Sequence, residues 1–164
     1  MSSPVIRSAV PEDIAEIRQL IVDLAVYEKE PDAVNLTEDK LASDVFAEHP
    51  AVFVYVAEAP EDSGHRIDGF ALWFLNYSTW EGVHGIYLED LFVREDSRGS
   101  GAGKALLRSL AQTAIDRGYK RVEWCVLKWN EPSIGFYKSL GAFPQDEWET
   151  YRLTGDALEK FAQS

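Results

Sequence analysis

The spacing of apolar residues alternates between helical and strand-like periods along the chain and predicts a series of alternating elements. A short strand is expected at 4–10, and Pro11 suits the first turn of the helix that follows. Thr37 can cap a second helix that runs to about residue 48. Two helix faces follow from apolar residues at helical spacing: Ile14, Ile17, Leu20, Ile21 and Leu24 in the first helix, and Leu106, Leu107, Leu110, Ala114 and Ile115 in a helix from Gly101 to about Gly118.

Longer apolar runs predict four further strands, at 51–59, 67–77, 83–94 and 121–128. The polar turn at 60–66 makes the first two of them an antiparallel hairpin. Because a helix separates the last two, these strands should be parallel and joined by a right-handed crossover.

The remaining residues predict a short C-terminal series of elements. Pro132 can open a short helix that Gly141 closes, 148–153 can form a last strand, and 154–162 a terminal helical turn. No repeat or interdomain linker interrupts the pattern. We therefore expect one α/β domain over residues 1–164, built on a mixed sheet.

Residues 87–104 combine a strand with a glycine loop that opens a helix. Such a loop exposes backbone N–H groups at the positive end of a helix dipole, where phosphates bind. A P-loop would need Ser or Thr after Gly103-Lys104, where Ala105 stands. A dinucleotide fingerprint would need Gly-x-Gly-x-x-Gly in an early βαβ unit. The loop instead reads Arg-x-x-Gly-x-Gly from Arg98 to Gly103, which indicates a phosphate-bearing ligand.

Two adjacent carboxylates, Glu89 and Asp90, lie in the strand before this loop. Neighbours in a strand point to opposite faces, and the surrounding residues are apolar or aromatic, so both faces should be covered. A carboxylate in such surroundings must be paired, hydrogen-bonded or functional. We expect Asp90 to be structural, meeting backbone groups or a buried arginine, and Glu89 to carry the chemistry.

The formal net charge of −12 argues against nucleic acid and against an anionic membrane as partners, and it suits a cationic small molecule. Residues 94–108 are a local exception, with Arg94, Arg98, Lys104 and Arg108 against only Glu95 and Asp96. A polyphosphate ligand would favour such a segment.

Targeting and redox features point to a cytoplasmic protein. The first residues lack the basic end and apolar core of a signal peptide, and no apolar stretch reaches the length of a membrane span. The single cysteine, Cys125, lies in a strand-like run, which predicts a buried thiol. His49, His65 and His84 share no metal-ligand spacing, so no metal is expected.

The order of these motifs resembles the GNAT superfamily of acetyl-CoA-dependent N-acetyltransferases. It is closer still to the spermidine/spermine N-acetyltransferase family, which includes thialysine N-acetyltransferases. The likeness covers nearly the whole chain. The segments that carry it are Val5-Ile6-Arg7, Leu24-Ala25-x-Tyr27-Glu28, Tyr87-Leu88-Glu89-Asp90-x-Phe92-Val93, Arg98-Gly99-x-Gly101-x-Gly103 and Trp129-Asn130-Glu131-Pro132-Ser133-Ile134-x-Phe136-Tyr137-Lys138. This resemblance implies a mostly antiparallel sheet with helices on both faces, whose one parallel pair splays around the cofactor.

The resemblance also implies a role for each matching residue. Tyr137 would be the proton donor and Glu89 the base, while Tyr27 and Glu28 match positions that contact the amine substrate. The backbone of Leu91, Phe92 and Val93 would pair with the pantetheine arm of acetyl-CoA. The other cofactor contacts would come from Arg98, Gly99, Ser100, Gly101, Ala102, Gly103 and Lys104 at the pyrophosphate and from Asn130, Glu131 and Pro132 on the far side of the arm.

For the reaction, the resemblance implies direct transfer of acetyl to a primary amine of a small molecule in a ternary complex, and a homodimer. The acceptor would be a thialysine-like amino acid, a diamine or a polyamine. Residues 77–80 lack the acidic residue that polyamine-acetylating members often carry there, and residues 153–158 look more like the thialysine branch. Two alternatives are acetylation of a protein N-terminus or lysine, and a non-catalytic acetyl-CoA-binding module.

Overall fold

A five-stranded sheet organises the first of the two units into which the computed structural model divides; this unit ends at Cys125 and the second begins at Val126. The structure describes residues 3–164. Sheet order follows chain order: β1 (Ile6–Ser8), β2 (Phe53–Glu58), β3 (Ile67–Ser78), β4 (Val83–Val93) and β5 (Val122–Trp124). Neighbouring strands are antiparallel except β4 and β5, which are parallel. The predicted hairpin and the predicted parallel pair are both confirmed.

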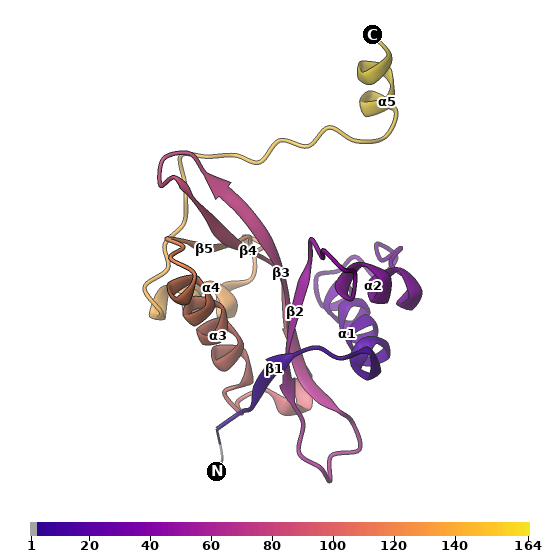
Figure 1. Ribbon diagram of the computed structural model, residues 1–164, viewed down its shortest axis with the longest axis vertical. Coiled ribbons are helices and arrows are strands. Elements are labelled where there is room, and N and C mark those ends of the chain that lie inside the picture. The colour runs from indigo at the N-terminus through magenta and orange to yellow at the C-terminus, as the bar shows by residue number, and fades with distance from the viewer. Residues whose placement is uncertain (1–2) are drawn as a thin grey trace. The chain divides into compact units, whose positions relative to one another are not determined.

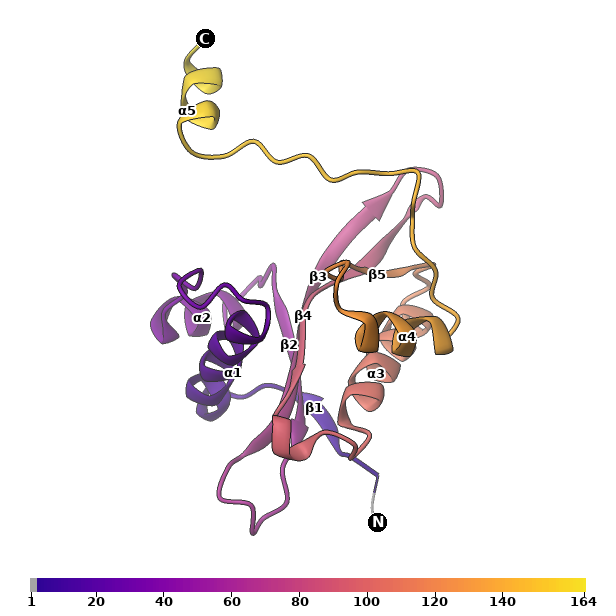
Figure 2. The same cartoon turned by 180° about the vertical axis from the view of Figure 1, so that it is seen from behind.

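Helices cover both faces of this sheet, as predicted (Figures 1 and 2). On one face, a 3-10 turn, η1 (Pro11–Asp13), leads into α1 (Ile14–Tyr27), which packs beside α2 (Glu38–Val45). Thr37 caps α2, because its hydroxyl oxygen accepts a hydrogen bond from the Lys40 amide at 3.2 Å. On the other face, a second 3-10 turn, η2 (Glu95–Ser97), precedes α3 (Ala102–Asp116).

The side chains of α1 and α3 form the two halves of the core. Ile17 and Leu20 of α1 are fully buried with Val56 and Phe70 of the sheet. Leu106 and Leu110 are fully buried on α3, but Ile115, predicted to be buried with them, is 71% exposed. Ile115 lies about 100° around the helix from Ala114, which takes it off the buried face.

Strand β5 is shorter than the predicted 121–128, since it ends at Trp124. Cys125 therefore lies beyond the strand, and its thiol is exposed rather than buried as predicted. Its sulfur lies 3.0 Å from the hydroxyl oxygen of Tyr87 on β4. Burial, followed by this hydrogen bond, raises the pKa of Tyr87.

The second unit contains two helices, α4 (Glu131–Ser139) and α5 (Gly155–Gln163). Both agree with the predicted helices, and Gly141 follows α4 with a φ of 92°. The strand predicted at 148–153 is absent from this unit, where residues 149–153 form neither helix nor strand. Alternating side chains alone do not make a strand, because its backbone groups need a neighbouring strand. Across residues 3–164, no helix is long and apolar enough to cross a membrane.

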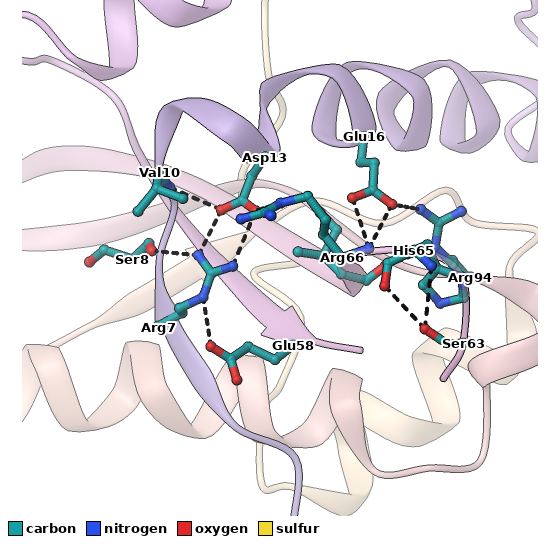
Figure 3. A network of polar contacts seen from close by, with 11 residues as sticks. Arg7, Ser8, Val10, Asp13, Glu16, Glu58, Ser63, His65, Arg66 and Arg94 are labelled. Atoms are coloured by element: carbon teal, nitrogen blue, oxygen red, sulfur yellow. Dashed lines mark hydrogen bonds and ion pairs between the residues drawn. The ribbon is translucent and has the colours of Figure 1, made fainter. Parts of the chain in front are cut away.

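A buried carboxylate, Asp13, ties the first unit together beside β1 (Figure 3). Its oxygens accept hydrogen bonds from Arg7 Nη1 at 2.7 Å, from the Val10 amide at 2.9 Å and from Arg66 Nε at 3.1 Å. Burial alone would raise the pKa of Asp13, but these hydrogen bonds outweigh it and hold the pKa below its ordinary value of 3.8. The network joins β1, η1 and the loop between β2 and β3.

We predict that Asp13→Ala lowers the free energy of unfolding by about 3 kcal/mol at pH 7, because it leaves two arginines without their shared acceptor. Since the native pKa is depressed, this contribution is present above about pH 4 and is lost as the pH falls through the native value. Urea unfolding from pH 7 to pH 3 measures it. The control Asp44→Ala breaks only the exposed ion pair with Lys40 and should cost less than about 0.5 kcal/mol. Equal losses in the two variants would contradict the prediction.

Candidate active site

Strand β4 carries one residue more than β3 at Glu89. Leu72 pairs with Asp90 and Trp73 with Leu88, so Glu89 has no partner on β3. Such a β-bulge bends its strand and redirects the side chains on it. Strand β5 pairs only with Ile86–Leu88 of β4, and among residues 3–164 no other strand continues this side of the sheet. The pairing of the two parallel strands therefore ends just before the bulge, and the predicted splay stays a prediction.

The bulge overturns the prediction that Glu89 and Asp90 lie on opposite faces. The charge of Glu89 acts on both Glu28 and Asp90, and the charge of Glu28 acts on Asp90 as well. Glu28 directly follows Tyr27, the last residue of α1. Glu28, Glu89 and Asp90 thus gather at the C-terminal end of α1, and we call them the carboxylate cluster. Glu89 is also exposed, whereas both faces of β4 had been expected to be covered.

The carboxylate cluster takes no part in the ion pairs that the arginines of residues 3–164 form. Within the part of the chain that the structure describes, no arginine forms an ion pair with any of its three members, so the expectation that Asp90 meets a buried arginine is wrong. Burial, followed by the charges of Glu89 and Glu28, raises the pKa of Asp90 to about 6. Burial, followed by the charge of Glu89, also raises the pKa of Glu28. A bound ammonium group would relieve this repulsion.

Helix α1 ends abruptly at the cluster. Lys29 adopts a left-handed conformation with φ 67°, which costs a non-glycine residue about 1 kcal/mol. The turn lets the Glu30 amide bond the Ala25 carbonyl at 2.8 Å, which closes the helix. Tyr27 and Glu28 are therefore held at the last turn of α1, with the Tyr27 side chain 38% exposed.

The glycine loop after η2 has the backbone of a phosphate site. Gly99 and Gly101 have φ values of 85° and 88°, which only glycine adopts without strain. The first hydrogen bond of α3 runs from the Ala105 amide to the Gly101 carbonyl, so the amides of Gly103 and Lys104 lie ahead of it, where a helix lacks internal acceptors. A Cβ on Gly103 would make only an ordinary 3.7 Å contact with Val93, so chain packing leaves room there. This arrangement fits a pyrophosphate.

The basic residues around the loop differ in what they contact. Arg94 was expected to contribute to a polyphosphate site, but its side chain binds other residues of the chain. Its Nε donates to the Ile67 carbonyl at 2.8 Å, and its Nη2 donates to Glu16 at 2.8 Å (Figure 3). The guanidinium of Arg98 instead lies over two rings, 5.3 Å from the centre of Phe92 and 5.5 Å from that of Tyr27.

A polar contact that the sequence did not indicate anchors the loop on its N-terminal side. Ser97, the last residue of η2, donates its hydroxyl to Asp68 at 2.9 Å, and His65 Nε2 lies 2.8 Å from the same oxygen. Asp68 is the extra residue of a bulge in β3, opposite β2. The alternation of apolar and polar residues along a strand does not show where a bulge lies, so no signal in the sequence pointed to Asp68.

The rest of the predicted site lies in the second unit. The Asn130 side chain caps α4 by accepting a hydrogen bond from the Ser133 amide at 3.4 Å, and Pro132 occupies the first turn. Tyr137 lies five residues after Pro132 on α4, and the centre of its ring is 5.7 Å from that of Phe136. Asn130, Glu131, Pro132 and Tyr137 therefore share one short helix and its cap, as the sequence predicted, and their roles stay predictions.

We predict that Asp90→Asn raises the free energy of unfolding at pH 7.5 but not at pH 4. The pKa of Asp90 is about 6 in the folded protein against an ordinary value of 3.8, so the carboxylate destabilises the fold only as the pH rises through and above this range. Urea unfolding at the two pH values tests this, with Asp32→Asn, an exposed carboxylate, as the control. The same change at both pH values would contradict the prediction.

Known proteins share both the sequence and the fold of this chain. The Acetyltransferase (GNAT) family model matches residues 14–142. Thialysine N-epsilon-acetyltransferase of Sus scrofa is 38% identical over 99% of both chains. An L-ornithine N5-acetyltransferase of Arabidopsis thaliana is 35% identical over 94% of this chain and 86% of its own.

Solved structures agree with these matches. An integron cassette protein from the mobile metagenome of V. cholerae superimposes with a TM-score of 0.80 and 30% identity over the whole of both chains. A probable acetyltransferase superimposes with a TM-score of 0.76 at 21% identity, which supports the fold alone. The glycine loop, the parallel pairing of β4 with β5 and these matches agree: the chain belongs to the GNAT family and is an N-acetyltransferase related to the thialysine N-epsilon-acetyltransferases.

Proposed function

We propose that this enzyme transfers the acetyl group of acetyl-CoA to a primary amine of a small molecule by direct attack in a ternary complex. The observation that carries the proposal is the carboxylate cluster, whose members raise one another's pKa and with which no arginine of residues 3–164 forms an ion pair. An alkylammonium group has the charge and size to bind there. In a protein of net charge −12, the wider field also favours a cationic acceptor.

The residues around the glycine loop suit the donor. Acetyl-CoA would supply an acetyl group activated as a thioester. Residues 99–104 would hold its pyrophosphate through backbone amides, assisted by the Arg98 side chain. Beyond Leu88, no strand of residues 3–164 lies on the β5 side of Leu91, Phe92 and Val93, and their backbone would pair with the pantetheine arm. Asn130, Glu131 and Pro132 would bind the far side of that arm.

Two side chains would move the protons. An alkylammonium with a pKa of about 10.4 must lose its proton before it attacks, which costs about 4.6 kcal/mol at pH 7. Glu89, exposed at the bulge, would accept that proton, directly or through water. Tyr137 would donate its hydroxyl proton to the departing thiolate. Tyr27 and Glu28 would contact the acceptor, and Asp90 would add charge to its binding site.

The names of the relatives favour an amino acid as the acceptor. Thialysine and ornithine both carry a primary amine at the end of a side chain, and proteins that acetylate them align with nearly the whole of this chain. Diamines and polyamines offer the same reacting group. We also propose, from the likeness to the family, that the enzyme is cytoplasmic and forms a homodimer. Sedimentation of the purified protein tests the homodimer.

The proposed reaction predicts a clear ranking in an acetylation assay. With acetyl-CoA, the enzyme should release thiol fastest with thialysine or ornithine, more slowly with spermidine and diaminopropane, and only at background rate with lysine-containing peptides and protein N-termini. Mass spectrometry should find the acetyl group on the side-chain amine. Faster turnover of peptides would support the protein-acetylation alternative, and no turnover with any amine would support a binding module.

We predict that Glu89→Gln lowers kcat/KM about 100-fold at pH 7, a typical effect of losing a general base. The loss should shrink at pH 9.5, where more of the amine is already deprotonated.

Tyr137→Phe should instead lower kcat without weakening acetyl-CoA binding, measured by calorimetry. Comparable pH profiles of wild type and Glu89→Gln would rule out Glu89 as the base, and full turnover by Tyr137→Phe would rule out Tyr137 as the acid.

A further inference from the structure

One side chain of the donor loop contacts a residue at the proposed acceptor site. Arg98 is the first residue of the glycine-loop motif, and its guanidinium carbon lies 5.5 Å from the centre of the Tyr27 ring at the end of α1. The same carbon lies 5.3 Å from the centre of the Phe92 ring on β4. Both distances are within the range of a cation–π interaction. The loop and the end of α1 are thus joined through one guanidinium.

The guanidinium can keep these ring contacts and still bind phosphate. A planar guanidinium that lies over rings keeps its N–H groups, which point outward in its own plane, free for other acceptors. Arg98 uses one of them, Nε, to donate to the Val93 carbonyl at 3.3 Å. Among residues 3–164 the remaining N–H groups of Arg98 have no acceptor, so they can reach the oxygens of a diphosphate.

We propose that Arg98 is a positioning residue that couples donor binding to acceptor binding through the Tyr27 ring. This inference rests on the proposed function. The diphosphate of the donor, held by the edge of the guanidinium, fixes the Tyr27 ring that contacts the amine. Acetyl-CoA therefore tightens the binding of the amine, and the amine tightens the binding of acetyl-CoA by the same factor.

The charge of Arg98 gives the coupling its sign. No carboxylate of residues 3–164 forms an ion pair with Arg98. Without a bound diphosphate, the positive charge of Arg98 beside Tyr27 therefore repels an incoming ammonium group. A bound diphosphate neutralises that charge, and it also restricts the side chain that packs on Tyr27. Both effects favour the amine, so the coupling is positive.

Calorimetry on the intact enzyme tests this with thialysine, and with ornithine as a second probe. CoA, which has no acetyl group to transfer, serves as the donor-site ligand. In the wild type, saturating CoA should lower the Kd of the amine about fivefold or more, the low end of coupling between two sites. In Arg98→Ala this ratio should fall to near one, and Arg98→Lys should recover only part of it, because lysine lacks the planar fork.

Three further variants separate coupling from simple damage to the loop. Lys104→Ala should weaken CoA binding but keep the fivefold ratio at saturation, because the two cation–π contacts belong to Arg98. Tyr27→Phe should keep the ratio and Tyr27→Leu should lose it, since the ring rather than the hydroxyl carries the contact.

The outcomes separate this inference from the proposed function. If the wild type acetylates and binds the amines but CoA leaves their Kd unchanged, the coupling is wrong and the function stands. An unchanged ratio in Arg98→Ala or in Tyr27→Leu overturns the role of Arg98. If neither amine binds with or without CoA, both this coupling and the assigned class of acceptor are wrong.

Discussion

The single extra residue in β4 determines how the candidate site is built. Because Glu89 has no partner on β3, the strand changes the side on which its following residues lie, and Asp90 comes to stand opposite Leu72 on the α1 side of the sheet. The same irregularity coincides with the end of the pairing between β4 and β5. One bulge thus brings two carboxylates to the end of α1 and opens the edge of β4 that the donor would pair with.

The fold treats two groups of carboxylates in opposite ways. Asp13 is buried but satisfied by two arginines and a backbone amide, so its pKa lies below the ordinary value and the ionised form stabilises the protein. Asp90 is half-buried and lies near the charges of Glu89 and Glu28, so burial and these charges hold its pKa above the ordinary value and the ionised form is unfavourable. The first arrangement stabilises the fold, and the second stores repulsion that a cationic ligand can relieve. Such trade-offs between stability and activity are common at functional sites.

Much of the architecture followed from the sequence because its elements are locally encoded. The helical spacing from Ile14 to Leu24, the Thr37 cap and the glycine loop each report on a few neighbouring residues, and the structure has each of them. The errors arose where distant residues decide. Side chains alternate between the two faces of a strand only where the pairing register is unbroken. The prediction assumed such a register and therefore placed Glu89 and Asp90 on opposite faces. It also extended β5 past Trp124 and made a strand of 148–153, where the pairing partner is missing. The partners of Arg94 and Asp68 likewise come from elements far away in the chain.

The central claim is that the carboxylate cluster binds the ammonium group of the acceptor, and the pKa of Asp90 tests it most directly. A 13C NMR titration of the Asp90 carboxyl, assigned by comparison with Asp90→Asn, should give a value of about 6 in the free enzyme. With saturating thialysine and CoA, a nearby positive charge should favour the ionised carboxylate and lower that pKa by a unit or more, as is typical for a cation within about 4–6 Å of a carboxyl group. An Asp90 pKa that stays the same or rises while thialysine is bound would contradict the account.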